Sequence, residues 1–106
     1  MSQGNNSALA KVDEGINKLC DKLKLPSFVR AKCLEMSTSM ETEGGAGLMG
    51  SEANAVACGV VSIVHEDARR RGRVDKHLPD RMIGIVFGID SGTLAHSKHI
   101  MNSRRR

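Results

Sequence analysis

Apolar residues recur at helical spacing along most of the chain, and this repetition constrains the fold more than any other feature. Between residues 9 and 23, apolar side chains follow one another at steps of three and four residues, which places them on one face of an α-helix. Alternation typical of a β-strand never extends beyond a few residues. The sequence therefore predicts an all-α domain, and 106 residues suffice for one core but not for two.

The apolar stripes predict two helices in the first part of the chain. Asn6 or Ser7 is expected to cap the first helix, because a short polar side chain can accept a hydrogen bond from a free backbone amide there. Pro26 disfavours helical backbone at the residue before it, and Ser27 is then in place to cap the second helix. Four glycines between residues 41 and 50 predict a loop.

Ser51 is expected to cap a third helix, which has a wide apolar face in which small residues are interleaved. Such a helix suits the centre of a bundle, where neighbours pack on several sides. Ala57 and Val60 are therefore expected to be among the most buried residues, and Gly59 is expected to let a neighbour come close. The polar and basic stretch from residue 65 to residue 76 is expected to be a solvated connection.

Two short helices are expected to complete an all-α, five-helix domain. Pro79 suits the first position of the fourth helix, and Gly88 suits a left-handed stop after it. Asp90 then caps a fifth helix over residues 91–102. The inward side chains are expected to be Met82, Ile83, Val86 and Phe87, then Leu94, the stem of Lys98 and Met101. The predicted organisation is a disordered segment 1–7, one domain over 8–103 and a basic tail 104–106.

Charge and aromatic content narrow the classes of ligand. The net charge of +4 permits binding to polyanions without requiring it. Besides the tail, basic residues gather in one arginine cluster, formed by Arg69, Arg70, Arg71 and Arg73. The chain has two phenylalanines and no other aromatic residue, so it has little on which to stack bases. This composition disfavours a platform for single-stranded RNA.

Several other classes of protein find no support in the sequence. The three cysteines lie far apart without a C-x-x-C pair, which predicts buried free thiols rather than a zinc site or disulfides. The N-terminus lacks the apolar core of a signal peptide, and the longest apolar run is too short to span a membrane. No spacing of nucleophile and base predicts an enzyme, and no motif predicts a cofactor.

The histidines do not predict a metal site either. His65 and Glu66 begin a zinc-protease pattern, but the second histidine that this pattern needs is replaced by Arg69. His96 and His99 are close enough in sequence to share a helix face, yet no third ligand is evident nearby. We therefore expect these side chains to be surface polar groups, with contacts to a DNA groove as the alternative.

Three segments resemble, in order and spacing, a cyclin-like repeat of the general transcription factor IIB family. They are INKLCDKLKLPSFVRAKCLEM, GLMGSEANAVACGVVSIV and IGIVFGIDSGTLAHSKHIM, and together they span residues 16–101. The most specific parts are the helix start at Leu25-Pro26, the Ala-rich helix after Ser51 and the turn leading into Thr93-Leu94. The chain is more similar to the second, C-terminal repeat of that family.

The resemblance implies that the last two helices form a helix-turn-helix, which in the family reads the major groove beside the TATA box. It implies double-stranded DNA and the TATA-binding protein as partners, with the RNA polymerase machinery as a further candidate. It also implies a nuclear location, or a cytoplasmic one for an archaeal or viral protein. Transferred by position, the base-facing residues are Ser91, Gly92, Thr93, Ala95, His96 and His99. The arginine cluster would hold phosphates.

The chain departs from the family pattern at several points. Ala95 stands where the family usually carries an arginine, so the bidentate contact to guanine is missing. Gly50, before Ser51, also replaces a frequent arginine, and neither a zinc ribbon nor a second repeat accompanies this one. These departures are expected of a fragment, a divergent paralogue, or a parasite or viral relative.

Two alternatives to DNA binding stay open. The first is a cyclin-type protein-binding module that uses an apolar groove between helices. In that case the arginines would keep the protein soluble or signal nuclear import. The second is a generic small helical regulator whose likeness to the family is accidental.

Overall fold

The computed structural model describes residues 3–42 and 53–104, and within these ranges the chain forms five helices and no strand. The helices are α1 (Gln3–Leu23), α2 (Ser27–Thr42), α4 (Ala53–Arg70), α5 (Asp80–Ile85) and α6 (Ser91–Arg104). The predicted all-α, five-helix class is therefore confirmed. The expected cap at Ser51, the Gly50 position and most of the predicted loop lie outside the described residues.

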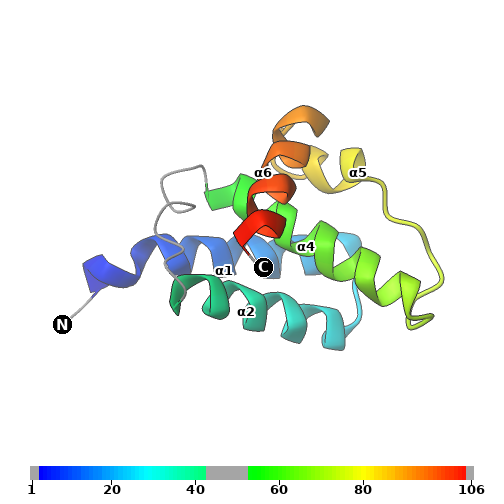
Figure 1. Cartoon of the computed structure of the whole chain (residues 1–106), viewed down its shortest axis with the longest axis horizontal. Coiled ribbons are helices and arrows are strands. Elements are labelled where there is room, and N and C mark those ends of the chain that lie inside the picture. Colours follow the sequence, from blue (N-terminus) through cyan, green and yellow to red (C-terminus); the bar gives the residue numbers. More distant parts are fainter. Residues whose placement is uncertain (1–2, 43–52, 105–106) are drawn as a thin grey trace.

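The helices pack around α4 (Figure 1). α1 and α2 run antiparallel beside each other, α4 packs against both, and α5 and α6 cover another side of α4. The fully buried side chains come from every helix. They include Val12, Ile16, Leu19, Val29, Val56, Val60, Val61, Ile83, Leu94 and Met101. A single core therefore joins the two ends of the described chain, as its length predicts.

The ends of α1 differ in part from expectation. The helix begins at Gln3, so residues 3–7 belong to it, and Asn6 and Ser7 lie inside it rather than at its cap. At the other end, the amide of Leu25 donates to the carbonyl oxygen of Cys20 at 2.9 Å, closing the last turn. Lys24 adopts a left-handed conformation there, with φ at 55°. Such a closure usually places glycine at this position, because lysine carries a Cβ that resists the conformation.

The start of α2 agrees with the expectation at Pro26. The carbonyl oxygen of Pro26 accepts hydrogen bonds from the amides of Val29 at 3.1 Å and Arg30 at 3.3 Å. Ser27 is the first helical residue, so its expected place as the cap is wrong and Pro26 holds that position. The Arg30 guanidinium also donates to the Asp21 carboxylate. This ion pair links the end of α1 to the start of α2.

α4 occupies the centre of the domain. Ala57 and Val60 are both 0% exposed, so their expected burial is confirmed. A Cβ added to Gly59 would clash with the Met101 side chain of α6, which confirms that Gly59 lets a neighbour come close. A Cβ on Gly15 of α1 would likewise press on Ala57, at 2.8 Å from its Cβ. Small residues therefore bring helices close to α4 from two directions.

The expected solvated connection from residue 65 is wrong in its first part, because α4 continues to Arg70. Val61, His65 and Ala68 follow one another at helical spacing and are all buried, at 0%, 5% and 6% exposure. The apolar face of α4 thus extends through a histidine into the basic end of the helix. The non-helical connection begins only after Arg70.

α5 is shorter and more exposed than expected. Pro79 caps it with extended backbone instead of occupying its first helical position. Ile83 is fully buried, and Val86 and Phe87 are half-buried, but Met82 is 47% exposed, so its expected burial is wrong. A helix of six residues makes fewer than two turns, so few of its side chains can face the core, and Ile83 is the large one that does.

Candidate functional site

α6 is held against α4 by three of its side chains. Leu94 and Met101 are fully buried, as predicted from their spacing. The hydroxyl of Ser97 donates to the carbonyl oxygen of Ala55 at 3.1 Å, across 42 residues of sequence. These contacts lie on one face of the helix, because positions 94, 97 and 101 follow helical spacing. The orientation of α6 is therefore fixed by packing on α4.

The turn between α5 and α6 agrees with its predicted chemistry. Gly88 adopts a left-handed conformation with φ at 69°, and the amide of Ile89 donates to the carbonyl oxygen of Gly84 at 2.9 Å. A carboxylate oxygen of Asp90 accepts a hydrogen bond from the amide of Thr93 at 3.0 Å, so the predicted cap is confirmed. Hydrogen bonds from Thr93 lower the pKa of Asp90, because they favour its charged form.

The residues assigned to DNA contact on α6 all lie on the protein surface. They are Ser91, Gly92, Thr93, Ala95, His96 and His99, and each is exposed. Helical spacing places Gly92, Ala95, His96 and His99 opposite the buried Leu94. The six assigned residues offer two imidazoles and two hydroxyl groups, and none of them carries a permanent positive charge.

Lys98 of α6 points toward the start of α5 and away from the residues assigned to DNA contact. Its ammonium donates to the carboxylate of Asp80, at the start of α5, at 3.0 Å. The other oxygen of Asp80 accepts from the hydroxyl of Ser62 on α4 at 2.7 Å. Lys98 is partly buried, as its predicted inward stem requires. Asp80 therefore ties α4, α5 and α6 together at one point.

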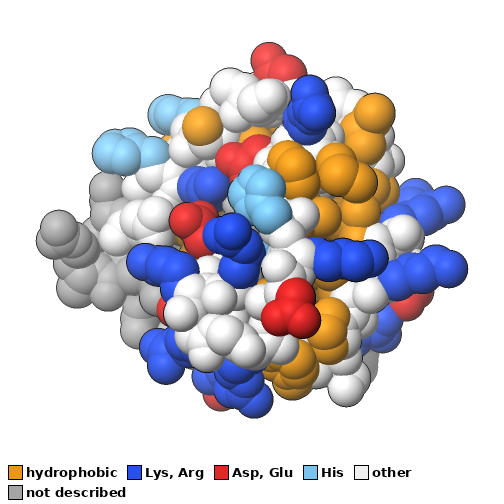
Figure 2. Space-filling model, turned by 90° about the vertical axis from the view of Figure 1, so that its right-hand side faces the viewer, with side chains coloured by type: hydrophobic (Ala, Val, Ile, Leu, Met, Phe, Trp, Pro, Cys, Tyr) orange, Lys and Arg blue, Asp and Glu red, His pale blue; other side chains and the backbone are white. Residues whose placement is uncertain are grey.

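The structure separates the members of the arginine cluster. Arg71 pairs with Asp67 at 2.9 Å, and Arg73 lies over the ring of Phe28, 4.7 Å from its centroid. These two arginines face α2, whereas Arg69 faces α6 across a polar hollow. Arg70 is exposed. Figure 2 looks onto this end of the molecule, where basic side chains are spread among hydrophobic ones instead of forming a single patch.

A polar hollow of about 310 Å³ lies between α4, α6 and the connection that precedes α5. Its polar lining includes Ser62, His65, Arg69, His77, Asp80 and Lys98, and we call it the α4–α6 hollow. Burial lowers the pKa of His65, and the nearby His77 and Arg69 lower it further. Sequence reasoning missed this site. The one signal that could have found it is the spacing of residues 62, 65 and 69, which share a helix face.

The cysteines do not form a site with the histidines. Cys20, Cys33 and Cys58 are free and buried, as predicted. Burial raises the pKa of Cys58 to about 12, which leaves it a thiol at neutral pH. Over residues 3–42 and 53–104, no group of three side chains is arranged to hold a metal ion, and no helix combines the length and apolarity needed to cross a membrane.

Comparisons with known proteins found no relative of this chain. No family model, no curated protein and no solved structure matches the chain.

Proposed function

We propose that the chain is a transcription factor that binds double-stranded DNA through α5 and α6, acting as a helix-turn-helix. The observation that carries the proposal is the placement of α6. Its inner side is fixed on α4 by Leu94 and Met101, and all six residues assigned to base contact are exposed. A helix held in this way presents its first turns as a rigid surface, as a major-groove reader requires.

The proposal includes the wider role implied by the resemblance to a transcription factor IIB repeat. In this reading the domain is cyclin-like, acts in the nucleus or in an archaeal or viral setting, and contacts the TATA-binding protein on a promoter. A gel-shift assay with purified TATA-binding protein on a TATA-containing duplex tests this part. A slower complex on addition of the chain is the expected result, and an unchanged TATA-binding protein complex would remove this partner from the proposal.

The DNA contact itself should be mainly electrostatic. None of the six residues assigned to base contact is an arginine or lysine that forms a bidentate contact with a base, and histidine or threonine offers single hydrogen bonds. Phosphate contacts carry little sequence information. We therefore expect weak discrimination between duplex sequences and a strong dependence of affinity on salt.

Ala95→Arg tests whether α6 enters the major groove. If it does, the new guanidinium should favour duplexes with guanine at one position by roughly 1–3 kcal/mol. Ala31→Arg is the matched control, because Ala31 is exposed on α2 and the substitution adds the same charge on a different helix. Binding to a randomised duplex library, followed by sequencing, measures both. Equal gains by the two variants on every duplex would contradict the helix-turn-helix proposal.

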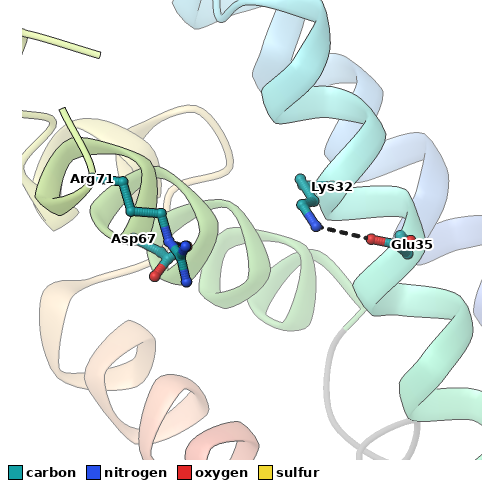
Figure 3. Close-up of polar contacts among 4 residues, drawn as sticks. All are labelled: Lys32, Glu35, Asp67 and Arg71. Carbon is teal, nitrogen blue, oxygen red and sulfur yellow. Dashed lines mark hydrogen bonds and ion pairs between the residues drawn. The ribbon is translucent and has the colours of Figure 1, made fainter. Parts of the chain in front are cut away.

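A second candidate function is docking of a partner protein in a groove between α2 and α4. The groove has a volume of about 590 Å³ and a lining that includes Phe28, Met36, Ile63, Val64 and Ala68. Charged pairs stand on its two walls, Lys32 with Glu35 on α2 and Asp67 with Arg71 at the end of α4 (Figure 3). Because neither pair joins α2 to α4, neither closes the groove.

An amphipathic helix is the occupant that an apolar floor with charged walls would suit. A fluorescent helical peptide with leucines on one face tests this function, compared on the wild type and on Met36→Gln, which adds polarity at nearly constant length. Weaker peptide binding by the variant, together with unchanged DNA binding, would favour the protein-docking module. Equal binding by both proteins would exclude the groove as the docking site.

A further inference from the structure

His65 is the least expected side chain in the domain. It is 5% exposed, lies on α4 and lines the α4–α6 hollow. Among the described residues, the buried polar atoms that lack a partner belong to Asp13 and Ser37, so the His65 ring is not one of them. Its side chain instead lines a polar hollow that a ligand can enter.

The neighbours of His65 indicate the charge of that ligand. The charged or titratable groups that line the hollow are Glu66 and Arg69 on α4, His77 in the connection, Asp80 on α5 and Lys98 on α6. Both oxygens of Asp80 are already engaged, by Ser62 and Lys98. Arg69 and His77 lie close enough to His65 to act on it electrostatically, and both effects disfavour a proton on it. An anion would relieve this repulsion and accept hydrogen bonds from all three donors.

A metal ion fits the hollow less well than an anion. The described residues contain no cluster of three ligands arranged for a metal, although two histidines and two carboxylates line the hollow. The Asp80 carboxylate is occupied by an ammonium and a hydroxyl group. Arg69 would repel a cation at short range.

We propose that the α4–α6 hollow binds a phosphate group, held by Arg69, His65 and His77. Arginine suits this role because its guanidinium donates two parallel hydrogen bonds to phosphate oxygens. Arg69 lies one turn after His65, so helical spacing directs both side chains to the same side of α4. The volume of about 310 Å³ leaves room for the group to which the phosphate is attached. This site does not depend on DNA binding, because a small phosphorylated molecule offers the same chemistry as a backbone phosphate.

The first test is a titration of the full chain with inorganic phosphate, followed by the histidine ring signals in proton NMR. The His65 signal, assigned by its loss in His65→Gln, should shift with saturation. Arg69→Gln should weaken phosphate binding roughly tenfold, the value of one charge-assisted hydrogen bond. Arg70→Gln is the matched control, because Arg70 is exposed on the same helix and does not line the hollow. An unmoved His65 signal, or equal losses in the two variants, would overturn the proposal.

A second test identifies the source of the phosphate. Duplex DNA affinity is measured with added phosphate and with sodium chloride of equal ionic strength. If phosphate weakens DNA binding by the wild type more than chloride does, and Arg69→Gln removes the difference, then the hollow takes a backbone phosphate. If phosphate binds at His65 but lowers DNA affinity no more than sodium chloride does, the ligand is a small phosphorylated molecule. Because the first titration needs no DNA, failure of the proposed DNA function would not obscure its result.

Discussion

Gly84 and Ile89 are joined so closely that the fold depends on the absence of a side chain at Gly84. The amide of Ile89 donates to the carbonyl oxygen of Gly84 at 2.9 Å, and a Cβ on Gly84 would clash with the Ile89 carbonyl oxygen. That oxygen belongs to the backbone, so no rotamer change can relieve the clash. The relationship fixes the direction in which the chain leaves α5, and with it the position of α6.

Gly84→Ala should therefore lower the free energy of unfolding by about 1–3 kcal/mol, the usual cost of overpacking. Gly92→Ala is the control, because a Cβ there meets nothing nearer than a carboxylate oxygen of Asp90 at 4.0 Å. In an exposed helical position alanine should gain roughly 0.5–1 kcal/mol over glycine. Urea unfolding of both variants measures the difference. A tolerated Gly84→Ala would show that the turn can adopt another path.

Ala57→Leu should cost on the order of 1–3 kcal/mol, because α4 has no space at this position. Ala57 is 0% exposed, and Gly15 of α1 approaches it closely. Ala31→Leu adds the same atoms on the exposed side of α2 and should change stability by less than about 0.5 kcal/mol. Thermal unfolding followed by circular dichroism compares the two. Equal stability would place α4 at the periphery of the fold.

Lys24→Gly should stabilise the protein by up to about 1 kcal/mol, because lysine holds a left-handed conformation at the end of α1. The same substitution two residues earlier, Lys22→Gly, should instead cost about 1 kcal/mol, because Lys22 lies in the last turn of the helix. The opposite signs make the pair informative, and chemical denaturation measures both. A loss of stability in both variants would mean that the lysine side chain contributes more than the strain at position 24 costs.

The stability of the domain should fall in mildly acidic solution because of His65. Its pKa is lowered in the folded state, mainly by burial, while the unfolded chain keeps a histidine pKa of about 6.5. Between these two values the unfolded state binds more protons, so stability rises with pH across this window and is fully present above about 6.5. The urea midpoint measured through this range should show the rise, and His65→Gln should flatten it. An unchanged slope in the variant would assign the effect to another group.

The four arginines of the cluster should contribute unequally to DNA binding. Arg71 and Arg73 are engaged by Asp67 and Phe28, whereas Arg69 and Arg70 are exposed on the last turn of α4. Neutralising Arg69 and Arg70 together should reduce the slope of log affinity against log salt by about 0.9 for each DNA phosphate that the protein no longer neutralises. Neutralising Arg71 and Arg73 together should reduce it less. The reverse order would place the interface on the α2 side of the molecule.

Local signals in the sequence predicted the parts of the fold that depend on local chemistry. Gly88 and Asp90 occupy their predicted stop and cap because a left-handed glycine and a short carboxylate act on their immediate neighbours. Leu94 and Met101 followed from helical spacing alone. These features orient α6, which is why the exposure of the residues assigned to DNA contact could be anticipated.

The α4–α6 hollow could not be predicted in the same way. His65 stands at the start of a basic stretch, which by composition belongs in solvent, and only the packing of α5 and α6 on α4 buries it. The prediction for Met82 was wrong for the opposite reason. Its apolar side chain suits a core, but the short α5 turns Ile83 toward the core and leaves Met82 on the other side. Both errors arise where burial is decided by a helix distant in sequence. DNA binding itself stays a prediction.

The central position of α4 also has a kinetic consequence. α5 and α6 reach the rest of the domain principally through α4, with a further contact from Lys18 of α1 to the Phe87 ring. A brief detachment of α5 and α6 would leave the packing of α1, α2 and α4 on one another in place. Amide hydrogens of α5 and α6 should then exchange through local opening, while those of α4 exchange only when the whole domain unfolds. Selection can therefore act on the surface of α6 largely independently of the paired helices α1 and α2.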